Sequence, residues 1–136
     1  MLVQAYGVCE YYRKVCMKNL TSYFKLLSDE TRLRIMILLF HSEFCVCQLT
    51  KITGISQPNV SKHLARLKDM GLVKDQRKEQ YSFYSIDIKD KLFERILESI
   101  VGNIEDYPTL KKDIARSKYA NEYIVQTNKH KKLKED

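Results

Sequence analysis

The chain has 136 residues, of which 44% are apolar, and this predicts one domain over residues 1–126. Its formal net charge of +7 predicts an anionic partner. Nucleic acid is the first candidate and an acidic membrane surface the second. No apolar run approaches the roughly 20 residues that span a bilayer, and the first residues are too polar and aromatic for a signal peptide. We therefore expect a cytoplasmic protein without a membrane segment.

An apolar stripe at steps of three and four residues predicts an N-terminal helix over residues 5–27, with a break near Thr21. The stripe consists of Cys9, Tyr12, Cys16, Leu20, Tyr23 and Leu27. Ser28, followed by two acidic residues, is typical of the N-cap of a second helix. That helix carries Leu33, Ile37 and Phe40 and is apolar on several sides, so we expect it at the centre of the fold.

The next segment has the spacing of a helix-turn-helix. A short helix begins at the Cys45-Val46-Cys47 element and ends at Gly54, and Ser56 caps another helix that carries Pro58 in its first turn. Strand-like stretches at 72–76 and 80–86 follow, with Arg77-Lys78-Glu79 as the predicted hairpin turn. Residues 28–86 therefore predict a mainly helical, winged helix-turn-helix core with a small β-hairpin wing.

The C-terminal third begins with an amphipathic helix over residues 90–106. Its apolar face is wider than a solitary small domain needs, so we expect it to pack across a two-fold axis in a homodimer. Pro108 interrupts the chain, and one weak helix follows up to about residue 125. We expect residues 90–125 to form the dimerisation helices and residues 127–136 to form a basic, flexible tail.

The second helix of a helix-turn-helix enters the major groove with its N-terminal part. Polar side chains there are the candidates for contacts to base edges: Ser56, Gln57, Asn59, Ser61, Lys62 and His63. Basic side chains further along the helix and on the wing are better placed for phosphates: Arg66, Lys68, Arg77 and Lys78. The alternative is an ordinary solvated helix face, and the basic hairpin after the helix favours the DNA-reading interpretation.

The residues from Phe24 to Ile86 resemble the ArsR/SmtB family of winged-helix regulators, and the blocks LSDETRLRIMILL, CVCQL, SQPNVSKHLARLKDMGLV and YSFYSI carry the resemblance in the right order. The resemblance implies a homodimeric transcriptional repressor, without enzyme activity or a required cofactor, that leaves operator DNA when an effector binds. Two recognition helices about 34 Å apart would match an imperfect palindrome. Glu79 departs from the family pattern because a Gly is common there.

Cys45 and Cys47 are the candidate effector ligands, because soft ions prefer thiolates and a helix N-terminus lowers a thiol pKa. Residues two apart on a regular helix point about 200° apart, so these thiols can share one ion only from an irregular first turn. EFCVCQL is similar to the sensor element of the family branches that respond to arsenite or antimonite, or to cadmium or lead.

Cys9 and Cys16 are the candidates for further thiolate ligands. On one continuous helix they lie about 10 Å apart along the axis, whereas two sulfurs on one ion are at most about 4.6 Å apart. Either one of them completes a three-thiolate site, or the segment unwinds and both bind, or both belong only to the buried stripe. Zinc sensing on residues 90–106 is disfavoured because that helix has no histidine.

Two other functions remain compatible with the sequence. The same DNA-binding fold can use oxidation of Cys9 or Cys16 as its trigger in place of a metal. The winged helix can also serve as a protein-interaction module, since a fold does not fix a function. A thiol oxidoreductase is disfavoured because the chain has no Cys-x-x-Cys motif.

Overall fold

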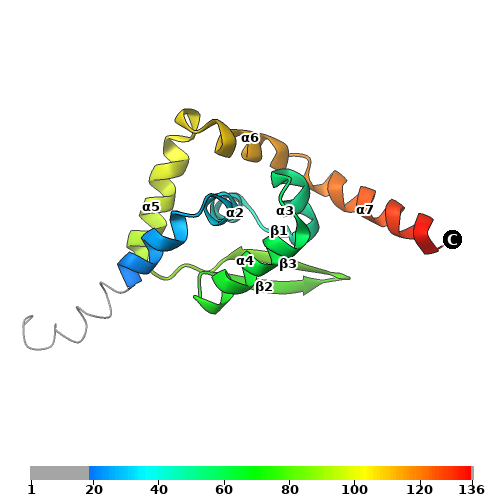
Figure 1. Ribbon diagram of the computed structural model, residues 1–136, viewed down its shortest axis with the longest axis horizontal. Helices are drawn as coiled ribbons and strands as arrows, with labels where there is room; N and C mark the ends of the chain where they lie inside the picture. The colour runs from blue at the N-terminus through cyan, green and yellow to red at the C-terminus, as the bar shows by residue number, and fades with distance from the viewer. Residues whose placement is uncertain (1–18, 136) are drawn as a thin grey trace, which may run out of the picture.

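The computed structural model describes residues 19–135, apart from the side chains at 125–127, 129–131 and 135. The chain is mainly helical and has one small antiparallel sheet of three strands in the order β1-β3-β2. Figure 1 shows α2 (Glu30–His41) in the middle of the fold, surrounded by the other helices, with the hairpin of β2 and β3 along the lower side. The predicted mainly helical, winged helix-turn-helix fold is confirmed.

The central helix α2 is buried from Ile35 to Leu39. Five consecutive buried residues point in all directions around a helix, so α2 is enclosed on every side, as its sequence predicts. The predicted cap is wrong by one residue. Asp29 is the N-cap and accepts a hydrogen bond of 2.9 Å from the Arg32 backbone N–H, while the Ser28 hydroxyl donates to the Lys25 carbonyl. A carboxylate is the stronger acceptor at the positive end of a helix.

Residues 19–27 form a helix that runs through Thr21, so the break predicted there is wrong. The part of the predicted helix before residue 19, with Cys9 and Cys16, lies outside the described residues. Tyr23 stacks on Phe93 with the ring centroids 4.3 Å apart, which joins this helix to α5 (Lys91–Gly102). Phe24 and Leu92 beside this stack are 55% and 51% exposed. Each of the two helices joined by this stack therefore exposes one large apolar side chain.

The helix-turn-helix consists of α3 (Val46–Thr53) and α4 (Gln57–Asp69). Gly54 ends α3 with a φ of 73°, a left-handed conformation that suits glycine, and Ser56 is the N-cap of α4. The inward side chains of α4 are the predicted ones, with Val60, Leu64 and Leu67 fully buried. The predicted register of the second helix is therefore confirmed.

The wing is formed by β2 (Val73–Lys78) and β3 (Tyr81–Ile86). Lys78 pairs with Tyr81, so the turn contains only Glu79 and Gln80. Arg77 and Lys78 therefore lie in β2, and the predicted longer turn is wrong. Glu79 has a φ of 58°, the left-handed conformation that a glycine would adopt more easily. The short strand β1 (Phe44–Cys45) pairs with the other edge of β3, with Cys45 opposite Phe83.

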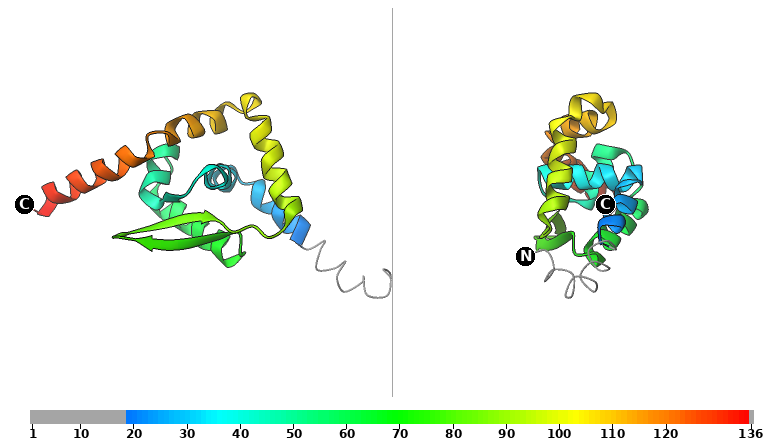
Figure 2. Two further views of the ribbon diagram at one scale, coloured as in Figure 1. Left: turned by 180° about the vertical axis from the view of Figure 1, so that it is seen from behind. Right: turned by 90° about the vertical axis from the view of Figure 1, so that its left-hand side faces the viewer.

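The chain after α5 continues through a short 3₁₀ helix (Ile104–Asp106) into α6 (Pro108–Ser117) and α7 (Ala120–Glu135). The sequence predicts only one helix after Pro108, followed by a tail from residue 127; the structure has two, and α7 continues as a helix through that tail. Figure 2 shows α7 projecting from the body. Within residues 19–135, no helix is long and apolar enough to cross a membrane.

A buried ion pair fixes α6 on the helix-turn-helix. The Arg34 guanidinium on α2 donates two hydrogen bonds to the Asp113 carboxylate on α6, of 2.7 and 2.8 Å. Its Nη2 also donates to the carbonyl oxygen of Thr53, the last residue of α3, at 2.9 Å. The Asp113 side chain is only 3% exposed. One guanidinium thus joins α2, α6 and the end of α3, just before the turn that leads to α4.

Candidate DNA interface and thiol site

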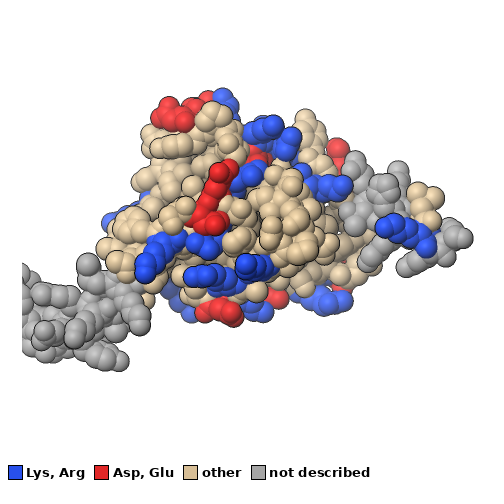
Figure 3. Space-filling model, in the orientation of Figure 1, with Lys and Arg blue, Asp and Glu red and all other residues tan. Residues whose placement is uncertain are grey.

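The outer face of α4 carries most of the predicted base-reading residues. Six of the predicted DNA-binding residues are exposed at or after the positive end of the helix: Ser56, Gln57, Asn59, Ser61, Lys62 and Arg66. The Ser56 side chain makes no capping hydrogen bond, so its hydroxyl is available to a ligand. Figure 3 shows Lys and Arg gathered along the lower part of the face in view, on the side where α4 and the wing lie. This surface suits a polyanion with hydrogen-bonding edges.

His63 differs from the other predicted base-reading residues. It is only partly exposed, and burial is the main cause that lowers the pKa of its imidazole. The charges of Asp29 and Arg32 at the start of α2 also act on it. His63 therefore faces the α2–α4 junction more than the outer surface, which sets it apart from the six exposed residues.

The predicted phosphate-binding residues fall into two groups. Lys68 pairs with Asp75 on β2 at 2.7 Å, and Lys78 pairs with Glu43, just before β1. Arg66 and Arg77 are exposed and form no ion pair within the described part of the chain. The two arginines can therefore bind a phosphate directly. Each of the two lysines must first give up its ion pair with a carboxylate.

The two described cysteines lie at the junction of the wing and the helix-turn-helix. Cys45 is the last residue of β1 and the N-cap of α3, with an extended backbone (φ −85°, ψ 168°), and Cys47 is the second residue of the helix. Because Cys45 is not helical, its side chain turns toward Cys47 and the two Sγ atoms lie 2.7 Å apart. This separation is within the limit of about 4.6 Å for two sulfurs that share one ion.

The two thiols are in contact through a hydrogen bond that shifts their pKa values in opposite directions. The hydrogen bond from Cys47 lowers the pKa of the Cys45 thiol to about 7, with help from backbone N–H groups at the start of α3. The same hydrogen bond, together with burial and the neighbouring charge, raises the pKa of Cys47. At neutral pH the pair therefore holds a thiolate that is ready for a soft cation and a second thiol that gives up its proton when the ion binds.

A third ligand for an ion at this pair does not come from the described residues. The described side chains include no group of three or more His, Cys, Asp or Glu that could hold a metal ion. Cys9 and Cys16 lie outside that range, so their participation stays a prediction. Sequence reasoning missed Thr50, three residues after Cys47, whose buried hydroxyl has no hydrogen-bond partner within the described part of the chain. No local signal in the sequence marks it.

Gln48 connects the thiol site to the C-terminal helix, and sequence reasoning also missed it. Its Oε1 accepts a hydrogen bond of 3.0 Å from the Cys45 backbone N–H, and its Nε2 donates one of 3.0 Å to the carbonyl oxygen of Ala120. The residue is only 2% exposed. A glutamine three residues after an N-cap is the signal of a capping box and could have indicated the first contact. The second contact depends on the tertiary fold.

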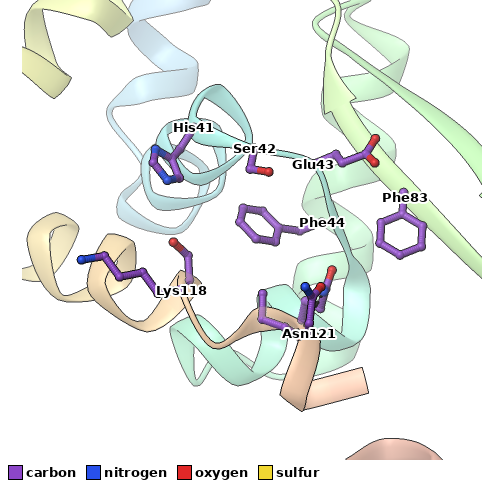
Figure 4. A pocket seen from close by; sticks show the side chains of 10 residues that line it. His41, Ser42, Glu43, Phe44, Phe83, Lys118 and Asn121 are labelled. Atoms are coloured by element: carbon purple, nitrogen blue, oxygen red, sulfur yellow. Dashed lines mark hydrogen bonds between the residues drawn. The ribbon is translucent and has the colours of Figure 1, made fainter. Parts of the chain in front are cut away.

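A hollow of about 310 Å³ lies beside the thiol site, between the end of α2 and the α6–α7 junction. Figure 4 shows the Phe44 ring inside it, with Lys118 and Asn121 on one side and Phe83 of the wing on the other. Gln48 also lines it, but neither cysteine of the described chain does. The hollow thus adjoins both the thiol site and the start of α7.

The arrangement of a helix-turn-helix, a wing and a thiol pair between them can be compared with known proteins. A family model described as "Bacterial regulatory protein, arsR family" matches residues 29–75, from the cap of α2 into β2. The arsenical resistance operon repressor of Staphylococcus aureus is 33% identical over 87 residues, which are 64% of this chain and 78% of that protein. The chain belongs to the ArsR family of bacterial regulatory proteins.

Other relatives of this ArsR-family chain align over shorter stretches. The arsenic resistance transcriptional regulator ArsR1 of Pseudomonas putida is 44% identical over 64 residues, 46% of this chain and 50% of the relative. The cadmium resistance transcriptional regulatory protein CadC of Listeria innocua is 38% identical over 69 residues, 50% of this chain and 58% of the relative. The chain thus matches only about half the length of these two relatives.

Solved structures support the ArsR-family fold over more of the chain. Reduced HlyU from Vibrio cholerae superposes with a TM-score of 0.60 at 25% identity and covers 71% of this chain and 96% of its own. A second solved structure is the homodimeric winged helix-turn-helix domain Mb0332 of Mycobacterium bovis, described as a possible ArsR-family transcriptional regulator. It superposes with a TM-score of 0.56 at 26% identity, and the match covers 68% of this chain and 86% of that domain.

Proposed function

We propose that this ArsR-family protein is a homodimeric transcriptional repressor that leaves operator DNA when a thiophilic ion binds Cys45 and Cys47. The observation that carries the proposal is the convergence of the two sulfurs, 2.7 Å apart, at the residue that joins β1 to α3. The effector classes are arsenite or antimonite, or cadmium or lead, in keeping with the names of the arsenic and cadmium resistance relatives.

DNA recognition rests on α4 and the wing. The exposed polar side chains of α4, with Gln57 and Asn59 in its first turn, have the chemistry to bind base edges in the major groove. Arg66 and Arg77 have the exposure and charge to bind phosphates on either side of that groove. The overall charge of +7 adds a sequence-independent attraction to duplex DNA.

The position of the thiol site explains how an ion could change DNA affinity without touching DNA. Cys45 pairs with Phe83 on β3, and the helix that starts one residue later ends at the turn before α4. An ion that moves Cys45 relative to Cys47 therefore acts on the wing and on α3 together. The ion needs only a higher affinity for the protein conformation that binds DNA weakly than for the conformation that binds DNA tightly.

The dimer surface is proposed at the 19–27 helix and α5. The exposed Phe24 and Leu92 side chains lie there, and the Mycobacterium bovis neighbour is homodimeric. Two-fold pairing of this surface would bring two copies of α4 to one duplex. Because α6 packs on α2 and α3 of its own chain, it is not part of the proposed surface.

The test begins with duplexes selected from a randomised pool by the reduced protein. Their dissociation constants are then measured by fluorescence anisotropy without and with arsenite, and separately with cadmium. We expect one of the two ions to weaken DNA binding at least about tenfold, a coupling of about 1.4 kcal/mol. The Cys45→Ser/Cys47→Ser variant should bind DNA normally and ignore both ions.

The Cys9→Ser/Cys16→Ser variant is the matched control for the number of thiols removed. This variant keeps Cys45 and Cys47 at the start of α3. Its response to the ions shows whether the two N-terminal cysteines contribute to ion binding. Release of DNA from the Cys45→Ser/Cys47→Ser variant at the ion concentrations that act on the unmodified protein would overturn the proposal. Failure of the unmodified protein to select any duplex would overturn the DNA-binding part.

A further inference from the structure

The C-terminal helix α7 is attached to the DNA-binding unit at two places. It begins at Ala120, whose carbonyl oxygen accepts the Gln48 hydrogen bond from α3. Eight residues later, the Asn128 side chain accepts hydrogen bonds from Tyr81 and Gln80 at the wing tip, the second of 3.1 Å. Figures 1 and 2 both show α7 leaving the body on the side of the wing tip and running past it. The helix therefore begins beside α3 and passes the tip of the wing.

The end of α7 that passes the wing is strongly basic. Residues 129–134 read KHKKLK, with four lysines in six positions. The described side chains Lys132 and Lys134 are exposed and take part in no ion pair within the described part of the chain. At a rise of about 1.5 Å per residue, these two lysines lie about 6 and 9 Å along the helix axis beyond Asn128.

The face of α7 that meets the wing is also the face on which part of this charge lies. Residues four apart share a helix face, so the described Lys132 lies on the same side of α7 as Asn128, which contacts Tyr81. Figure 3 shows Lys side chains on the projecting helix as well as along the lower part of the body. Basic side chains therefore lie both on the body near the wing and on α7 beyond it.

We infer that the basic end of α7, with Lys132 and Lys134, is a further DNA-contacting element that binds phosphates flanking the stretch covered by α4 and the wing. This inference rests on the proposed DNA-binding function. Duplex DNA is the occupant that fits, because the segment has the charge to bind a polyanion and follows directly on Asn128, which is hydrogen-bonded to the tip of the wing. If this basic helix were only solvated, replacing its lysines would change DNA affinity no more than replacing lysines elsewhere on the protein.

The test compares two variants that lose the same charge. Lys132→Gln/Lys134→Gln changes α7, and Lys111→Gln/Lys112→Gln changes two exposed lysines of α6, which lies at the top of Figure 1, away from α4 and the wing. The probes are fluorescein-labelled duplexes of mixed sequence, one of about 16 base pairs and one of about 40. The centres of two successive major grooves lie about 10 base pairs apart, so the short duplex has little flanking DNA and the long duplex has much. Dissociation constants are measured by anisotropy over a series of KCl concentrations.

We expect the α7 variant to bind the long duplex about tenfold more weakly than the unmodified protein. Each phosphate that a protein neutralises adds about 0.9 to the steepness of log K against log salt, so removing two lysines should reduce that steepness by about 1.8 per protomer. The short duplex should show a smaller change, and the α6 variant should match the unmodified protein on both. Circular dichroism at 222 nm should be unchanged, since glutamine and lysine have similar helix propensities.

Two results would contradict the inference, and they are distinguishable. If the unmodified protein binds both duplexes with salt-dependent affinity and the α7 variant behaves like the α6 variant, α7 does not contact DNA and the proposed function stands. If the unmodified protein binds neither duplex at any salt concentration, the proposed DNA-binding function fails together with the inference.

Discussion

Gln48 Nε2 donates a hydrogen bond of 3.0 Å to the carbonyl oxygen of Ala120, 72 residues further along the chain. The same side chain accepts from the backbone N–H of Cys45, so one buried amide connects the thiol site to the first residue of α7. Gln48 thus gives Cys45 a direct link to the C-terminal helix, in addition to its strand pairing with the wing.

Replacing Gln48 by methionine should destabilise the protein, because it leaves the Cys45 N–H buried without its partner and removes the hydrogen bond to the Ala120 carbonyl. A buried unsatisfied group costs about 1–3 kcal/mol, so we expect the free energy of unfolding to fall by about 1–3 kcal/mol in urea denaturation. Gln57→Met on the exposed face of α4 is the control and should change it by less than about 0.5 kcal/mol. Equal effects of the two substitutions would show that the Gln48 hydrogen bonds contribute nothing.

Removing one partner of the buried ion pair should be costly. Asp113→Asn leaves the Arg34 guanidinium without its counter-charge, and we expect the free energy of unfolding to fall by about 3 kcal/mol in urea denaturation. The double variant Arg34→Met/Asp113→Leu should recover most of that stability, because the uncompensated charge is gone. Glu105→Gln breaks the exposed pair with Lys111 and should cost less than about 1 kcal/mol. An effect of Asp113→Asn no larger than that of Glu105→Gln would contradict this interpretation.

The Cys45 thiol should titrate near neutral pH. In a Cys9→Ser/Cys16→Ser background, thiolate absorbance at about 240 nm should rise with a midpoint at about pH 7, and Cys47→Ala should move that midpoint up toward the ordinary value of 9.0. Because the pKa of Cys45 is lowered on folding, this group stabilises the folded state increasingly from about pH 7 to 9 and no longer does so as the pH falls through 7. A midpoint that Cys47→Ala leaves unchanged would show that the thiols do not interact.

The wing turn carries strain at Glu79, whose φ of 58° is unfavourable for a residue with a large side chain. Asparagine tolerates this conformation better, so Glu79→Asn should raise the free energy of unfolding by about 0.5–1 kcal/mol. Glu79→Gly should raise it less, because glycine also increases the entropy of the unfolded chain. Glu79→Ala removes the same charge without relieving the backbone and should give no increase; an increase equal to that of asparagine would point to the charge instead.

The elements that bury a regular apolar stripe are the ones that could be predicted from the sequence. In α4, Val60, Leu64 and Leu67 recur at helical spacing, and the structure buries all three. In β2 only Val73 is buried, so no alternation marks where the strand ends, and the sequence pattern places the turn too early. The later C-terminal helices bury few side chains, so a local pattern could not separate α6 from α7.

The contacts that position the thiol site could be predicted only in part. The irregular start of α3 follows from the requirement that two thiols separated by one residue converge, and the structure brings Cys45 and Cys47 together in this way. The long-range partners of Gln48 and Asp113 depend on how α6 and α7 return to α3, which no local spacing encodes. Ser28 and Asp29 are both good caps, and only the chain path decides between them.

The central claim is that an ion at Cys45 and Cys47 and DNA on α4 oppose each other. It is tested most directly by anaerobic titration of the reduced protein with arsenite and cadmium, following the ultraviolet sulfur-to-metal band with and without a saturating selected duplex. The account predicts saturation at one ion per protomer and an affinity that DNA weakens by the same factor, about tenfold or more, by which the ion weakens DNA binding. A band that saturates identically with and without DNA, or no band at all, would contradict it.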